Sequence, residues 1–165
     1  VEHFLLFYRV AVFDDFLENG YTIEEQKMLN ESRKILHDDQ LLISATCVRV
    51  PVEISHSESV QIEFESNVGV EDATRVLGDY GGMKVVDDPA QNQYPMPLEA
   101  SGKDDVLVGR IRKDIAHEHG LVLWLSCDNL RKGAALNALQ IMDEALRRNA
   151  LRPAAERTGH AAEIV

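Results

Sequence analysis

The chain is short of basic residues. Its 165 residues include 17 lysines and arginines against 28 aspartates and glutamates, which gives a formal net charge of −11. A surface with this charge repels nucleic acids and anionic membranes on average, so we expect neither as a partner. A small anion bound at a local basic cluster is still compatible with this balance.

Cysteine is scarce as well, with Cys47 and Cys127 far apart in the sequence. Neither belongs to a CxxC pair or to a Cys/His spacing typical of zinc ligands. This argues against a disulfide-rich scaffold and against a structural zinc site, and we predict no metal site. Both cysteines lie in apolar runs, so we expect buried thiols in a protein of the reducing cytoplasm.

Long hydrophobic runs and phosphate loops are also missing. The apolar start, VEHFLLFYRVAVF, is too short to span a bilayer, and it lacks the basic region and cleavage site of a secretory leader. The sequence begins without methionine, from which we expect a processed, truncated or excised piece. No glycine-rich nucleotide loop and no internal repeat is found.

What remains is the composition of a soluble globular domain, with 45% apolar and 27% charged residues. Thr22 and Glu25 have the spacing of a capping box, which predicts a helix from Thr22 to about Leu36. Residues 41–52 are rich in β-formers, and their alternation predicts a strand with Ile43, Ala45, Cys47 and Arg49 on one face.

The rest of the chain predicts a sheet with few helices. We expect a turn at 55–59, strands at 59–65, 84–86, 106–114 and 120–128, helices at 70–77 and 129–148, and an irregular excursion at 87–105. In the strand at 59–65, Val60, Ile62 and Phe64 should face inward. This order favours an α+β domain with a mixed or antiparallel sheet and helices on one face. Pairing with a second copy would cover the other face.

Two residues of the middle region could carry chemistry. Arg49 could grip a carboxylate with its guanidinium fork, or it could be an edge-strand arginine that reaches solvent. His56 could transfer a proton near neutral pH, or it could be an ordinary loop histidine. Glu24 and Lys27 share a helix face and could contact a zwitterionic or phosphorylated ligand, although a surface ion pair explains them equally well. Residue type alone leaves each of these alternatives open.

Four stretches are informative through their exact residues, beyond the secondary structure that their hydrophobic pattern predicts. They read NGYTIEEQKMLNESRKIL, SATCVRVPVEISHSESVQIEFE, VVDDPAQNQYPMPLEASGKDDVLVGRIRKD and GLVLWLSCDNLRKGAALNALQI. In this order and nearly without gaps, over roughly residues 17–146, they resemble the C-terminal half of bacterial aspartate-semialdehyde dehydrogenase. The resemblance implies a fold like the C-terminal domain of glyceraldehyde-3-phosphate dehydrogenase, assembled as a homodimer or homotetramer.

The resemblance also implies an activity. Enzymes of this family are oxidoreductases of lysine, threonine and methionine biosynthesis, and they convert L-4-aspartyl phosphate to L-aspartate 4-semialdehyde with NADPH. A cysteine thiolate in the N-terminal half forms an acyl-enzyme, which hydride from NADPH then reduces. The small-molecule substrate, aspartyl phosphate, would thus be the ligand of the site.

The family's motifs give roles to individual residues. In the motif CVRVPV…HSES, the histidine is the general acid/base and the arginine binds the substrate α-carboxylate, which implies these roles for His56 and Arg49. In the motif EExK, the first acid contacts substrate and the lysine contacts phosphate, which implies these roles for Glu24 and Lys27. The polar residue that opens the last helix contacts the nicotinamide cofactor, which implies Asn129.

Two functional parts of the family's enzymes are not found in this sequence. The nucleophilic cysteine and the glycine-rich cofactor loop are not found, so the resemblance implies that NADP is bound mostly by an N-terminal domain and that this chain alone is inactive. We expect a poorly matching segment at 1–16, a substrate-binding and dimerisation domain at 17–148, and a frayed tail at 149–165. The alternative is a non-catalytic dimerisation module or a degenerate relative of the enzyme.

Overall fold

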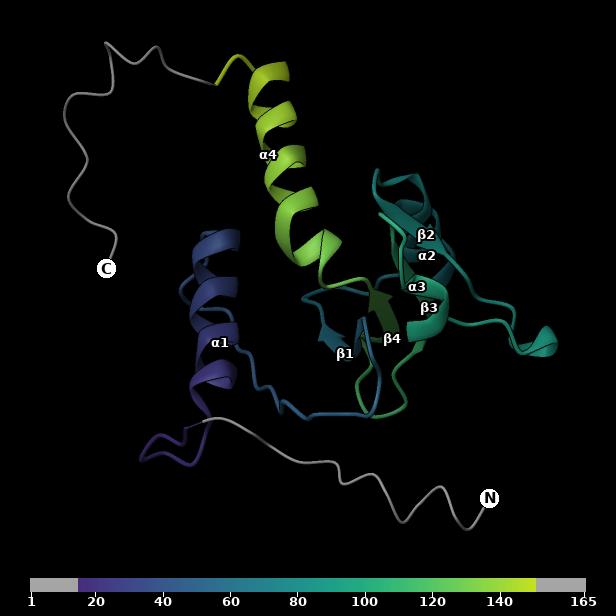
Figure 1. The fold of residues 1–165 in the computed structure, drawn as a ribbon. Coiled ribbons are helices and arrows are strands. Elements are labelled where there is room, and N and C mark those ends of the chain that lie inside the picture. The colour runs from purple at the N-terminus through teal and green to yellow at the C-terminus, as the bar shows by residue number, and fades with distance from the viewer. Residues whose placement is uncertain (1–14, 151–165) are drawn as a thin grey trace. The chain divides into compact units, whose positions relative to one another are not determined.

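The computed structural model describes residues 15–150. The chain forms two compact units, Val1–Glu53 and Ile54–Val165 (Figure 1). Most of the expected N-terminal segment and most of the expected tail, at 1–14 and 151–165, lie outside the described residues. Among the described residues, no helix is both long and apolar enough to cross a membrane.

The first unit contains helix α1, Ile23–Leu36, and the capping box predicted for it is confirmed. The Glu25 amide donates to Thr22 Oγ1 at 3.2 Å, and the Thr22 amide donates to Glu25 Oε2 at 2.8 Å. These two bonds satisfy backbone donors that a helix start otherwise leaves open. The helix ends where predicted, because His37 takes a left-handed conformation with φ 54°.

The strand predicted at 41–52 is wrong. This stretch has no strand in the described structure beyond a single bridge residue at Arg49. The Cys47 amide donates to Glu25 Oε1 at 2.8 Å, which ties this stretch to the start of α1. The alternation itself is kept, with Ile43, Ala45 and Cys47 half-buried, but Arg49 is exposed. A β-rich sequence becomes a strand only where another edge accepts its hydrogen bonds.

The second unit contains a four-stranded sheet. Its strands are β1 His56–Glu63, β2 Met83–Val85, β3 Val106–Lys113 and β4 Gly120–Cys127, in the order β1-β4-β3-β2. β4 is antiparallel to both β1 and β3, and β2 is parallel to β3, which confirms the predicted mixed sheet. The turn predicted at 55–59 is wrong, because His56 already belongs to β1 and the sharp bend falls on Ser55, with φ 92°.

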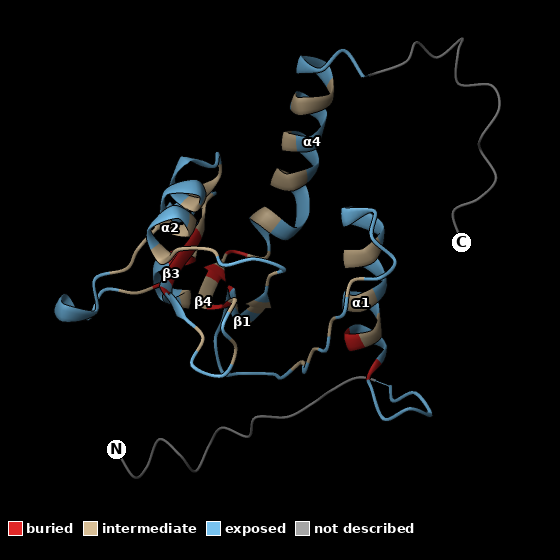
Figure 2. Cartoon of the chain, turned by 180° about the vertical axis from the view of Figure 1, so that it is seen from behind, coloured by how far each residue is buried: buried red, intermediate tan, exposed pale blue. Residues whose placement is uncertain are grey.

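The hydrophobic core lies on one face of this sheet. Val108, Ile111 and Leu123 are buried there, and Val60 and Ile62 of β1 pack beside them, as their alternation predicts. Helix α2, Val70–Asp79, covers this face with three apolar side chains of its own, namely Val70, Ala73 and Leu77. In Figure 2 the buried segments of this unit are concentrated on β3 and β4.

Two connections of the second unit differ from their predictions. The stretch at 87–105 is irregular only in part, because it contains a 3₁₀ turn, η1 Pro89–Gln91, and a short helix, α3 Pro97–Ala100, that contacts β4. The continuous helix predicted at 129–148 is wrong as well. The segment instead contains a wide turn, η2 Arg131–Ala135, followed by helix α4, Leu136–Arg147. Ala134, within η2, has non-helical dihedral angles. The small side chains around Ala134 leave the backbone free to kink there.

Candidate functional site

His56 stands at the first position of β1, a strand at the edge of the sheet. Its side chain is exposed, and no hydrogen bond to its imidazole is formed within the described part of the chain. Its backbone is held, because Ser126 Oγ donates to the His56 carbonyl at 3.3 Å. The imidazole is thus accessible to a ligand while its main chain is fixed.

Ser55, the residue before His56, is buried at 3% exposure and adopts a positive φ of 92°. Such a backbone conformation costs a serine on the order of 1–3 kcal/mol and persists only where its surroundings hold it. The Ser55 amide donates to Asn129 Oδ1 at 2.9 Å, and Ser55 Oγ donates to the Pro97 carbonyl at 3.0 Å. Two segments distant in sequence therefore meet Ser55 at the start of β1. One is α3, through Pro97, and the other is the turn between β4 and η2, through Asn129.

Asp128 organises the same end of the sheet. Its carboxylate accepts hydrogen bonds from the amides of Leu130 at 2.9 Å and Arg131 at 3.2 Å, in the turn that leads into η2. Its second oxygen accepts from the Gly102 amide at 2.7 Å. These backbone bonds, that of Gly102 first among them, hold the pKa of Asp128 below its ordinary value. The carboxylate stays charged and fixes the chain on both sides of Asn129.

Cys127 lies directly across from His56 in the antiparallel pair. Burial raises the pKa of this thiol, and the charges of Glu58 and Asp128 raise it further, against an opposing effect of Lys132. A thiol kept protonated is a poor nucleophile. Cys127 therefore does not fit the role of the acyl-accepting cysteine. The expectation of buried thiols is wrong, because Cys47 and Cys127 are both half-buried.

The first unit contains the other candidates. Lys27 Nζ lies 3.1 Å from Glu24 Oε2, with side chains that are 51% and 56% exposed, so the predicted helix-face pair is present. Glu25, by contrast, points to the backbone amides of Thr22 and Cys47 and is buried, as expected for a structural acid. Through Cys47, it ties the segment that contains Arg49 to the start of α1.

The structure thus places the predicted residues in two groups. Glu24, Lys27 and Arg49 belong to the first unit, and His56 and Asn129 belong to the second. The described geometry joins Glu24 to Lys27 directly and joins Asn129 to His56 through Ser55. The roles that the resemblance implies for Arg49 and His56 stay predictions.

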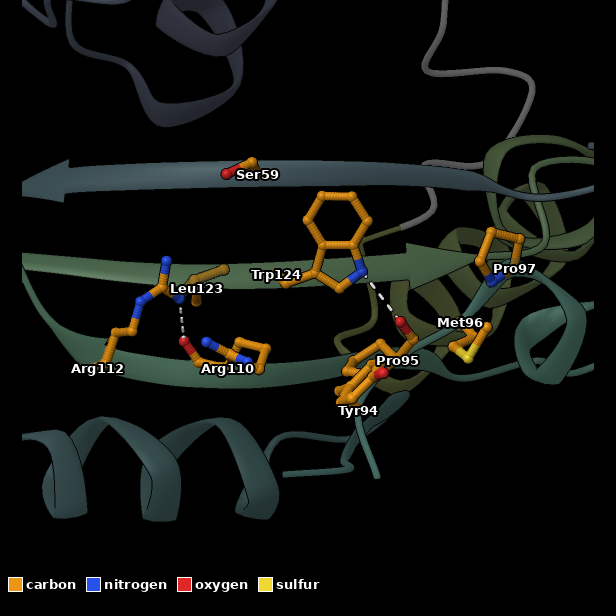
Figure 3. A pocket seen from close by; sticks show the side chains of 9 residues that line it. All are labelled: Ser59, Tyr94, Pro95, Met96, Pro97, Arg110, Arg112, Leu123 and Trp124. Carbon is orange, nitrogen blue, oxygen red and sulfur yellow. Dashed lines mark hydrogen bonds between the residues drawn. The ribbon is translucent and has the colours of Figure 1, made fainter. Parts of the chain in front are cut away.

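A hollow of about 370 Å³ opens on the second unit, and none of these residues lines it. It is lined by Ser59, Tyr94, Pro95, Met96, Pro97, Arg110, Arg112, Leu123 and Trp124. Figure 3 shows Trp124 turned toward Pro95, to whose carbonyl its Nε1 donates at 3.0 Å, with Arg110 and Arg112 beside each other on β3. In residues 15–150 no group of His, Cys, Asp and Glu side chains could hold a metal ion.

Sequence reasoning missed Ser55 and Ser126 altogether and described Asn129 only as a cofactor contact. Serines next to a histidine are too common to signal a structural role. A buried serine with a positive φ is unusual, but that dihedral angle is visible only in the structure. Asn129 could have been flagged because it follows Asp128, at a position where polar side chains favour contacts with nearby backbone amides.

Several curated proteins are similar in sequence to this chain. The aspartate-semialdehyde dehydrogenase of Aquifex aeolicus is 51% identical to this chain over 141 residues, which are 86% of the chain and 42% of the relative. The enzyme of the same name from Bacillus subtilis is 49% identical over 140 residues, which are 84% of the chain and 40% of the relative. The chain therefore spans well under half the length of these curated relatives.

Solved structures of proteins with the same name are also similar to this chain. The chain resembles aspartate semialdehyde dehydrogenase II from Vibrio cholerae, crystallised as a complex with ASA, with a TM-score of 0.78 and 41% identity. The match covers 84% of this chain and 40% of that one. The sequence model of the family described as "Semialdehyde dehydrogenase, dimerisation domain" matches residues 5–132. The chain belongs to the semialdehyde dehydrogenase family and contains its dimerisation domain.

Proposed function

We propose that the chain is the substrate-binding and dimerisation part of an aspartate-semialdehyde dehydrogenase. The proposed enzyme converts L-4-aspartyl phosphate to L-aspartate 4-semialdehyde and phosphate, in the cytoplasmic synthesis of lysine, threonine and methionine. A thiolate displaces phosphate from the acyl phosphate to give a thioester. A hydride then adds to the thioester carbonyl, and the C–S bond breaks to release the aldehyde and the thiol. The observation that carries this proposal is the 51% identity to the Aquifex aeolicus enzyme over 86% of the chain.

His56 is the acid/base of this proposal. A neutral imidazole accepts the proton of the attacking thiol, and the resulting imidazolium returns a proton to the sulfur when the aldehyde leaves. The exposed ring of His56 suits this role because nothing in the described residues occupies its nitrogens. The nucleophile itself is a cysteine of another part of the enzyme, because Cys127 remains a protonated thiol.

The first unit supplies the groups that bind substrate. The Arg49 guanidinium is a planar fork that matches the α-carboxylate, and it is exposed. Lys27 provides a point charge for the phosphate, and Glu24 accepts from the α-ammonium. Their mutual ion pair at 3.1 Å keeps both charges on one helix face until substrate separates them.

The reductant of the proposal is NADPH, which supplies the hydride when it is bound. Residues 15–150 contain no glycine-rich phosphate loop, so most of the cofactor site belongs to the rest of the enzyme. Asn129 fits a smaller part in it. Its Oδ1 accepts from Ser55, which leaves its side-chain N–H groups to donate to the carboxamide of a nicotinamide ring.

Reconstitution tests the proposal. The chain is mixed with the N-terminal portion of the Aquifex aeolicus relative, and the consumption of NADPH is followed with aspartyl phosphate as substrate. We expect turnover in the mixture, and His56→Ala should lower it by about 10²–10⁴-fold, the usual contribution of general acid–base catalysis.

His119→Ala is the matched control, because His119 directly precedes β4 at the end of the β1–β4 pair opposite to His56, where its carbonyl accepts from the Phe64 amide at 3.3 Å. It should stay within about twofold of the unaltered chain, because its half-buried ring contacts His117 and lies at the other end of β1 from His56. A His56→Ala mixture that turns over at the normal rate would remove the role assigned to the imidazole.

A second candidate function is assembly without catalysis. It is favoured by the family match, which is to a dimerisation domain, and it implies a homodimer or homotetramer. Sedimentation of the chain at micromolar concentration tests it directly. A strict monomer that also fails to bind a full-length relative would exclude this function.

A further inference from the structure

The geometry points to a second role for Asn129, and this inference rests on the proposed function of His56. We infer that Asn129 is a positioning residue for His56, which acts through the Ser55 amide. The Ser55 N–H donates to Asn129 Oδ1 at 2.9 Å, and Ser55 is the residue immediately before the histidine. The role is separate from any contact between the Asn129 amide and a cofactor, because it uses the oxygen and not the nitrogen.

Ser55 adopts a strained backbone conformation. A serine with φ 92° is outside the regions that L-residues prefer, and Ser55 is 3% exposed. In this buried position water cannot replace a lost partner of its amide. Asn129 Oδ1 is the partner that the structure gives to this amide, so it supports an unusual conformation that a free chain would leave.

The bend at Ser55 lies immediately before β1. Ser55 ends the connection to the first unit, and His56 begins β1, so the dihedral angles of Ser55 set the direction in which the strand starts. The Ser55 hydroxyl is anchored on the Pro97 carbonyl, and the His56 carbonyl accepts from Ser126 Oγ. The backbone is therefore held on both sides of the His56 Cα while the imidazole stays exposed.

The backbone around Asn129 is itself held in place. Asn129 follows Asp128, whose carboxylate binds the amides of Leu130, Arg131 and Gly102. Asn129 thus stands between a buried, fully bonded acid and the first helical turn. A side chain mounted in this way can hold Ser55 in one place, which a side chain on a mobile loop could not.

The test compares Asn129→Ala, Asn129→Asp and Asn67→Ala. Alanine removes the acceptor for Ser55, while aspartate keeps an oxygen there but has no N–H to donate. Asn67 is the matched control, because its amide oxygen also accepts a hydrogen bond, from Lys113, in a different loop. Hydrogen exchange at the Ser55 amide, followed by NMR on the chain alone, reports the proposed contact without any activity.

We expect Asn129→Ala to accelerate exchange at the Ser55 amide by roughly tenfold or more, and Asn129→Asp and Asn67→Ala to leave it within about threefold. In the reconstituted enzyme, Asn129→Ala should lower kcat by up to about 100-fold, the effect of a misplaced catalytic group, and Asn129→Asp should restore most of it. A rise in KM for NADPH that aspartate does not rescue would report the separate cofactor contact.

Two outcomes would overturn the inference. One is unchanged exchange at the Ser55 amide in Asn129→Ala, and the other is a kcat of Asn129→Asp as low as that of Asn129→Ala. If the alanine variant does not fold, the aspartate variant still decides, because loss of Ser55 protection in a folded Asn129→Asp chain contradicts the role. Normal turnover of His56→Ala would instead defeat the proposed function, whatever the exchange at Ser55 shows.

Discussion

The two units of the chain are built on different interactions. Among the described residues of the first unit, the buried side chains are those of Thr22 and Glu25, which are polar and bonded to each other's backbone. In the second unit the buried core is aliphatic, with Leu107, Val108 and Leu121 at 2% exposure or less. The described part of the first unit is therefore organised by hydrogen bonds, whereas the second has a packed aliphatic core in addition to its buried polar residues Ser55, Ser126 and Asp128.

This contrast separates the tasks of the proposed enzyme. A packed sheet resists local opening, so it suits the residue whose position must be exact, which is His56 in the proposal. A helix with an extended segment tied to it by Glu25 can adjust its side chains, which suits the groups that receive the substrate's charges.

The largest difference is expected for one substitution made in both units. Leu121→Ala removes a side chain that is 2% exposed, and it should lower the free energy of unfolding by about 2–5 kcal/mol because a cavity remains. Leu42→Ala alters a side chain that is 90% exposed, and it should change stability by less than about 0.5 kcal/mol. Urea unfolding of both variants measures the difference, and equal losses would contradict the contrast between the units.

A smaller and local effect is expected in the first unit. Glu25→Ala leaves the amides of Thr22 and Cys47 without their acceptor, which should cost about 1–3 kcal/mol. Exchange at the Cys47 amide should accelerate, while exchange in the strands of the second unit should stay unchanged. Glu31→Ala, an exposed position on the same helix, is the control. If the strands of the second unit also lose protection, the units are not independently stable.

The sequence was sufficient to predict features that depend on residues close together in the chain. The capping box of Thr22 and Glu25 and the alternation of Val60 and Ile62 involve neighbours along the chain, and both were confirmed. The segment at 41–52 has equally good β-formers, but whether it becomes a strand depends on a partner edge that the sequence does not reveal. The contact between Ser55 and Asn129 spans 74 residues and involves two ordinary polar side chains, so no local pattern could have predicted it.

Acid should act on the second unit through Asp128. The pKa of this carboxyl is lowered in the folded chain, so its contribution to stability is fully present above the unfolded value of about 3.9 and is lost as the pH falls through the folded pKa. Asp128→Asn should remove this dependence, so the stability difference between the two chains should shrink as the pH falls below about 4. Unfolding measured along a pH series checks this, and a constant difference would show that the carboxylate's charge has no part in it.

The smallest effect is expected at the far end of the second unit, on α4. Hydrogen bonds from Arg147 and then Arg148 lower the pKa of Glu144 to about 2. All of these side chains are exposed, so salt should screen their interaction and move the pKa back toward its ordinary value. Arg147→Gln should raise the pKa in the same direction without a measurable change in the unfolding of the sheet. NMR titration of the Glu144 carboxyl measures both effects. A loss of sheet stability in Arg147→Gln would mean that α4 supports the packed core of the second unit. The exposed ion pairs of α4 would then have to be counted among the interactions that stabilise the second unit, together with the packing of its sheet.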